Sequence, residues 1–90
     1  MTKALISVTG QDTTGIIARV ATKLSELNIN ILDITQTILS GCFTMMMVVD
    51  LALCTESFVN LQNVLKTFGE GRGLSIRIQR EDIFDAMHKL

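Results

Sequence analysis

The chain contains few of the features that reinforce a small domain from within. Two cysteines, Cys42 and Cys54, are present in 90 residues, and they form neither a CxxC motif nor a Cys/His cluster. A zinc site is therefore not expected, and a disulfide between the two cysteines is an alternative without support. We predict two free thiols in a reducing cytoplasm. Because a domain of this length is only thinly stable alone, oligomerisation is the expected reinforcement.

The net charge is close to zero and aromatic side chains are few, and both features argue against nucleic-acid binding. The formal net charge is −1, which argues against a surface built to hold a phosphate backbone. All four aromatic residues are phenylalanines, and only Phe43 lies on a predicted strand, so the base-stacking sheet of RNA-binding domains is missing. No direct nucleic-acid partner is expected.

Long apolar runs are absent as well. The longest run, residues 45–49, is far too short to span a membrane. The start of the chain does not resemble a signal peptide, because Lys3 is followed by a short apolar run and then by polar residues. We therefore expect a cytoplasmic protein that does not bind a membrane.

Groups suited to catalysis are few. The only histidine, His88, lies in the tail, and no Ser-His-Asp or Cys-His arrangement is evident. Gly10 and Gly15 are spaced as in a P-loop, but no Lys-Ser/Thr pair follows them. Acylphosphatase uses an arginine-bearing loop at the corresponding place, and residues 10–14 contain neither arginine nor lysine. We predict that the protein is not an enzyme, with an acylphosphatase-like activity as the less favoured alternative.

Hydrophobic residues make up 48% of the chain, and their spacing changes along it. Helical spacing begins at Ile16, and strict alternation begins at Leu74. Ser40-Gly41 is typical of a two-residue hairpin turn, and Thr55 is the predicted N-cap of the second helix. The spacing predicts strands at 4–8, 31–39, 43–51 and 74–79 and helices at 16–27, 55–68 and 82–89. This much apolar surface exceeds what one small sheet hides, which again favours a subunit interface.

The predicted order of the main elements is β-α-β-β-α-β, followed by a short helix. This order is that of the ferredoxin-like split βαβ arrangement. We predict an α+β fold with a four-stranded antiparallel sheet, two helices on one of its faces, and a single domain over residues 1–90. Right-handed crossovers place the first and third strands in the centre and the other two at the edges.

Several segments resemble the ACT-domain family, and together they extend over nearly the whole chain. Residues 10–17 (GQDTTGII) resemble the polar loop and glycine that open the first helix of an ACT domain. Residues 27–31 (LNINI) resemble its exit from that helix. Residues 33–37, 43–46 and 76–84 are similar to a subfamily of bacterial and archaeal single-ACT proteins of about ninety residues. That subfamily is related to the ACT domains of glycine-cleavage repressors.

The resemblance implies a regulatory module that binds a small molecule, most often an amino acid, between two paired domains. One copy then supplies its first loop and helix start, and the other supplies the start of its second strand. The positions that match are Asp12, Gly15 and Ile16 for one half and Asn30, Ile31 and Leu32 for the other. Serine-binding members carry a histidine at the loop, where this chain has Gly10, so serine specificity does not follow. The implied partners are a second copy and an unidentified protein target, and no cofactor is implied.

Each proposed ligand residue also has a structural interpretation. Gly15 suits a carboxylate at a helix N-terminus, and it equally suits a tight turn. Asn30 offers amide groups to a ligand, or it satisfies backbone groups at the helix exit. Asp12 pairs with an ammonium group or caps the first helix. A ligand-free dimerisation module is therefore the alternative function.

Two further groups were considered for other roles. Residues 45–47 are three methionines on one strand, which favours one core face and one interface face over a thioether metal site. Glu81, Asp85 and His88 follow helical spacing and would suit a divalent metal. A solvated helix face is the favoured interpretation of these three, so no metal site is predicted.

Overall fold

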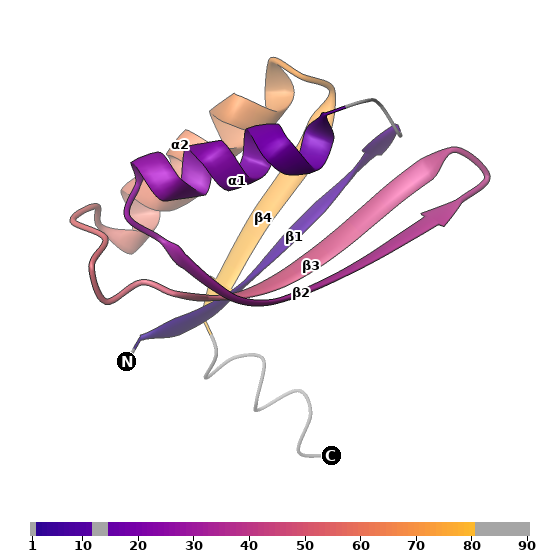
Figure 1. Cartoon of the computed structure of the whole chain (residues 1–90). Coiled ribbons are helices and arrows are strands. Elements are labelled where there is room, and N and C mark those ends of the chain that lie inside the picture. Colours follow the sequence, from indigo (N-terminus) through magenta and orange to yellow (C-terminus); the bar gives the residue numbers. More distant parts are fainter. Residues whose placement is uncertain (1, 12–14, 81–90) are drawn as a thin grey trace.

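The computed structural model describes residues 2–11 and 15–80, which form four strands and two helices (Figure 1). Their bounds are β1 (Lys3–Gln11), α1 (Ile16–Glu26), β2 (Asn30–Leu39), β3 (Cys42–Asp50), α2 (Phe58–Glu70) and β4 (Leu74–Arg80). The predicted element order and the ferredoxin-like α+β fold are confirmed. The predicted helix at 82–89 lies outside the described residues.

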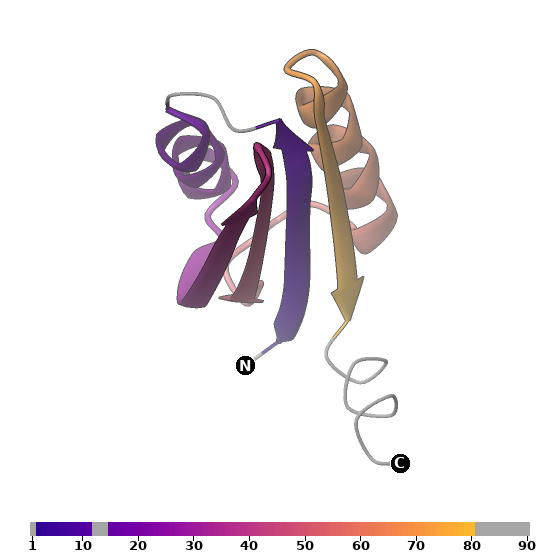
Figure 2. The ribbon, with the colours of Figure 1, turned by 90° about the vertical axis from the view of Figure 1, so that its right-hand side faces the viewer.

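The sheet has the strand order β2-β3-β1-β4, and every neighbouring pair is antiparallel. The first and third strands are therefore central, as predicted. Both helices lie on the same side of the sheet (Figure 1). Figure 2 shows α2 beside β4 at one edge and α1 toward β2 at the other. The free edge of β2 is consequently on the α1 side of the molecule.

The core lies between the sheet and the two helices and consists of apolar side chains alone. Within the described residues no polar or charged residue is buried. Alternate residues of the strands point to the helices, so that Met45 and Met47 are each 1% exposed while Met46, on the other face, is 42% exposed. The helices contribute residues spaced by about one turn. The buried residues of β1, β3 and β4 are Ala4, Ile6, Val8, Phe43, Met45, Met47, Val49, Leu74, Ile76 and Ile78, and those of the helices are Ile16, Val20, Leu24, Leu61 and Leu65.

The hairpin turn agrees with its sequence signal. Ser40 has φ 52° and Gly41 has φ 78°, so both residues adopt the left-handed conformation of a tight two-residue turn. A turn of this kind matches the right-handed twist of the flanking strands. The register of β2 against β3 is therefore set locally, with Leu39 opposite Cys42.

Three element boundaries in the described residues differ from the sequence prediction by two residues or more. β1 continues to Gln11, because Gly10 pairs with both Phe43 and Leu74 and so extends the sheet where a loop was expected. α2 is capped by Ser57, whose Oγ accepts a hydrogen bond from the backbone N–H of Asn60 at 3.1 Å, so the prediction of Thr55 was wrong. Both residues are good N-caps, and the apolar stripe that begins at Phe58 decides between them. α2 also passes through Gly69, which was expected to break it.

Gly69 is buried where α2 crosses β4, and the helix and strand backbones approach closely there. A Cβ at this position would lie 2.6 Å from the carbonyl oxygen of Leu74 and 3.1 Å from Cγ1 of Ile76. Only glycine permits this approach without displacing backbone atoms. Gly71, two residues later, has a helical φ of −67° and no atom nearer than 4.0 Å to such a Cβ.

We expect Gly69→Ala to lower the free energy of unfolding by about 1–3 kcal/mol, the usual cost of overpacking. Gly71→Ala is the matched control and should be neutral or stabilising by up to about 1 kcal/mol, because it restricts only the unfolded chain. Urea unfolding followed by circular dichroism measures both. Equal effects of the two substitutions would contradict the close contact between α2 and β4.

Candidate functional site

The start of α1 exposes backbone groups that suit an anion. Gly15 is the N-cap, with φ 85° and ψ 6°, and no side chain of residues 2–11 and 15–80 caps the helix. The first N–H groups of a helix have no partner within it, and the helix dipole favours negative charge beside them. Asp12 lies outside the described residues. Ile16 is 4% exposed and belongs to the core, so it offers its backbone N–H rather than its side chain.

Arg19 lies next to this helix start, and sequence reasoning missed it. Its Nε is 3.9 Å from the position that a Cβ on Gly15 would occupy, and its backbone N–H donates to the carbonyl of Gly15 at 3.0 Å. The guanidinium is thus one helical turn from the cap. The sequence did contain a signal for Arg19, because it is the fourth residue of a predicted helix that follows a glycine.

The other end of α1 turns sharply into β2. Asn28 has φ 59°, the left-handed conformation that closes many helices. The N–H of Ile29 donates to the carbonyl of Leu24 at 2.9 Å, and the N–H of Asn28 donates to that of Ser25 at 3.0 Å. These two bonds form a Schellman motif. The helix-exit role considered for Asn30 therefore belongs to Asn28, and the exposed Asn30 begins the strand.

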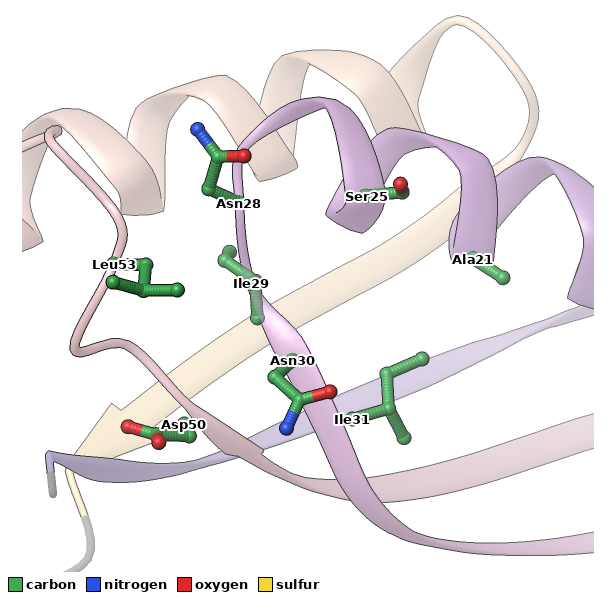
Figure 3. A pocket seen from close by; sticks show the side chains of 8 residues that line it. All are labelled: Ala21, Ser25, Asn28, Ile29, Asn30, Ile31, Asp50 and Leu53. Carbon is green, nitrogen blue, oxygen red and sulfur yellow. The ribbon is translucent and has the colours of Figure 1, made fainter.

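A hollow of about 550 Å³ lies between the end of α1, the start of β2 and the segment after β3 (Figure 3). It brings together two of the six predicted ligand residues, Asn30 and Ile31. Leu32 does not line it and is 41% exposed. The residues around the hollow are Ala21, Ser25, Asn28, Ile29, Asn30, Ile31, Asp50 and Leu53.

Asp50 is a further acidic group at this hollow that the sequence did not reveal. It ends β3 directly opposite Asn30. Its Oδ1 accepts hydrogen bonds from the backbone N–H of Ala52 at 3.0 Å and of Thr2 at 3.3 Å. None of the described residues that line the hollow is a lysine or an arginine. The amide groups and the carboxylate therefore suit a positively charged or hydrogen-bond-donating ligand group.

One chain does not bring the two predicted halves together. Gly15 begins α1, and Asn30 follows its other end (Figure 1). A helix of 11 residues is about 16 Å long. This distance exceeds the reach of a ligand the size of an amino acid, so one chain cannot place both predicted halves on the same ligand.

The other candidate groups are separated. Glu81, Asp85 and His88 lie outside the described residues, and within 2–11 and 15–80 no three histidine, cysteine or acidic side chains gather as metal ligands. Cys42 and Cys54 are both free thiols. Neither helix in the described part of the chain is long and apolar enough to cross a membrane.

The family model for the ACT domain matches residues 2–79. The chain belongs to the ACT-domain family. ACT domains are typically regulatory ligand-binding domains, and the resemblance seen in the sequence is thereby confirmed.

Relatives of this ACT domain are found in bacteria and archaea. A UPF0237 protein of Bifidobacterium longum is 52% identical over 90 residues, which is all of both chains. A UPF0237 protein of Methanocaldococcus jannaschii is 43% identical, again over the whole of both chains. The solved ACT domain protein from Streptococcus pneumoniae is 43% identical with a TM-score of 0.83, over 92% of this chain and 93% of that one.

A more distant solved structure shares the fold alone. It is a formyltetrahydrofolate deformylase from Pseudomonas syringae, which is 19% identical with a TM-score of 0.80. The match extends over 89% of this ACT domain and only 28% of the deformylase.

We expect Gly15→Ala to lower the free energy of unfolding by about 1–2 kcal/mol, because alanine is strained in the left-handed conformation. Among the described residues the added Cβ meets nothing closer than Arg19 Nε at 3.9 Å, so the cost expected there is conformational. Gly15→Asn should cost less, since asparagine tolerates this conformation better. Thermal unfolding compares the two variants, and equal melting temperatures would show that the positive φ is not what requires glycine.

Proposed function

We propose that this ACT domain is a cytoplasmic sensor that binds an amino acid between two copies of the chain. The observation that carries the proposal is the separation of the two half-sites by the length of α1. Each half alone is open and incomplete, and a homodimer supplies both. The response to the ligand is regulatory rather than catalytic.

The free edge of β2 is the surface that we assign to dimerisation. Among the described residues β2 pairs with β3 alone, and an unpaired edge offers backbone groups to another strand. Three apolar side chains along β2 are substantially exposed, namely Leu32 (41%), Ile34 (44%) and Ile38 (55%). Antiparallel pairing of two β2 edges about a two-fold axis would give a continuous sheet and cover these side chains.

Such pairing would also align the half-sites. β2 runs opposite to α1, so α1 begins at the end of the sheet where β2 finishes (Figure 1). A two-fold axis through the β2 edge brings the start of one β2 toward the end of the other. Asn30 of one copy then approaches Gly15 of its partner. The hollow at Asn30 and the helix start at Gly15 would thus face one another across the interface.

The chemistry of the two halves supports an α-amino acid as the ligand class. The helix start at Gly15 and the guanidinium of Arg19 suit a carboxylate. Asn30 and Asp50 suit an ammonium group, and Ile31 with Leu53 offers apolar surface to a side chain. Serine is not specifically proposed, because a Cβ at Gly10 would lie 2.9 Å from the carbonyl oxygen of Gly73, which excludes a histidine there.

The signal passes to a separate protein in this proposal. Binding of the amino acid would stabilise the dimer and change the surface that it presents, by the difference in affinity between the two states.

We expect Ile34→Lys to convert the dimer to monomers, because a charge on an edge strand opposes pairing with another strand. Val59→Lys is the matched control, since Val59 is 66% exposed on α2 and away from β2. Light scattering after size exclusion gives the masses. A mass unchanged by Ile34→Lys, or reduced equally by both substitutions, would contradict the β2 interface.

We expect one of the twenty amino acids to raise the melting temperature of the wild-type protein. At 100 times its dissociation constant, a ligand adds about 2.7 kcal/mol of stability. Asn30→Ala should remove most of this shift, and Gln62→Ala, an exposed amide on α2, should leave it unchanged. If no amino acid raised the melting temperature of a protein that is dimeric, the sensor proposal would be overturned and the ligand-free dimerisation module favoured.

A further inference from the structure

A second recess, unrelated to β2, lies between the two helices. Two adjoining hollows of about 300 and 520 Å³ share Lys23, Phe68 and Arg72 in their walls. Arg19 lines the first hollow, and Asn63 and Val64 line the second. We call this recess the helix groove and define it by Arg19, Lys23, Phe68 and Arg72. It combines three cations with one aromatic ring.

Phe68 holds two of the cations in place without neutralising them. The guanidinium carbon of Arg72 is 4.0 Å from the centre of the Phe68 ring, and Nζ of Lys23 is 5.8 Å from it. A ring face attracts a cation through its quadrupole and carries no net charge. Arg72 also donates from one terminal nitrogen to the carbonyl oxygen of Phe68 at 3.1 Å. An arginine has five N–H donors, so most of them remain available to a ligand.

The third cation, Arg19, is available as well. Within residues 2–11 and 15–80 its side chain has no hydrogen-bond or ion-pair partner. The only acidic residue in the walls of the two hollows is Glu26, one turn beyond Lys23 on α1. The net charge of the groove is therefore positive in a chain whose formal charge is −1. Attraction of an anion to this place would be local and would not come from the overall field of the molecule.

We propose that the helix groove binds an acidic segment of a partner protein. Guanidinium groups pair with carboxylates through two parallel hydrogen bonds, and two of the three cations are arginines. Arg19 and Lys23 lie one turn apart on α1, and Arg72 lies in the turn that follows α2. This spread suits successive carboxylates on one chain better than a single small anion. Val64 and the Phe68 edge offer apolar surface beside them. Glu26 opposes an acidic residue at its end of the groove and so sets the direction of the segment.

The groove goes beyond the proposed amino-acid site and shares one residue with it, Arg19, while Lys23, Phe68 and Arg72 belong to the groove alone. Both use α1, but the groove faces α2, whereas the half-sites lie at the two ends of α1. The groove would supply the contact through which a sensor of this size reaches its target. A protein that binds no amino acid could still bind an acidic segment there.

The test uses the full chain and a fluorescein-labelled decaglutamate peptide at low salt, with affinity measured by fluorescence anisotropy. We expect saturable binding that weakens about tenfold or more in the double variant Arg19→Ala/Arg72→Ala, since exposed charge contacts each contribute up to about a factor of five. Arg77→Ala/Arg80→Ala is the matched control. It removes the same charge and also one arginine–phenylalanine contact, because Arg80 lies 4.8 Å from the Phe58 ring. This control should bind the peptide with nearly wild-type affinity.

Other outcomes would overturn the proposal. Equal weakening in both double variants would show attraction by net charge alone. Absence of binding to the wild type would exclude an acidic segment. If the wild type instead bound tripolyphosphate but not the peptide, and the groove variant lost this binding, the groove would be assigned to a small phosphate ligand. The single variant Arg19→Glu controls for loss of peptide binding through unfolding, because Arg19 makes no side-chain hydrogen bond or ion pair in the described part of the chain. That variant should fold normally and still lose the peptide.

Discussion

Burial of one face of a four-stranded sheet by only two helices is the constraint on which the rest of the structure depends. α2 packs on β4, at a distance that requires Gly69, and α1 covers the region toward β2. Ile34 and Ile38 lie opposite Met47 and Phe43, so they belong to the face that the helices cover. They nevertheless remain about half exposed, whereas Met47 and Phe43 are 1% and 2% exposed, because β2 is the edge strand and has a neighbour on one side alone within the described residues. The apolar face of the sheet is thus covered by a helix at β4 and left partly exposed at β2.

Most of the fold could be predicted from the spacing of apolar residues. Val20 and Leu24 repeat along α1, and Leu74, Ile76 and Ile78 alternate along β4, and in each case the burial follows the pattern. The prediction was wrong where two residues compete for one role. Thr55 and Ser57 are equivalent N-caps by residue type, and only the packing of the helix selects Ser57.

The candidate site could be predicted only in part, because it depends on one irregularity in a strand. The Ser40-Gly41 turn alone would place Asp50 opposite Ile31. A register shift between Ile31 and Asp33 moves every earlier residue by one position, so that Asp50 comes opposite Asn30. No residue in this stretch signals a bulge, and Asp50 was missed for that reason. The burial of Ile16 was foreseen in the helix pattern, but its consequence, that only the backbone is available to a ligand, required the structure.

The length of α1 has a consequence for how a sensor of this kind responds in a cell. Two half-sites that cannot meet within one chain make the amount of working receptor a function of how much protein is present. In the proposed sensor, few dimers would exist at low copy number, and the same metabolite level would then produce a weaker response. Binding of the ligand would raise the affinity of the two subunits for each other, and dimerisation would raise the affinity for the ligand by the same factor. The expression level of such a protein would therefore set its detection threshold, and a change in transcription would retune the sensor without altering any residue of its site.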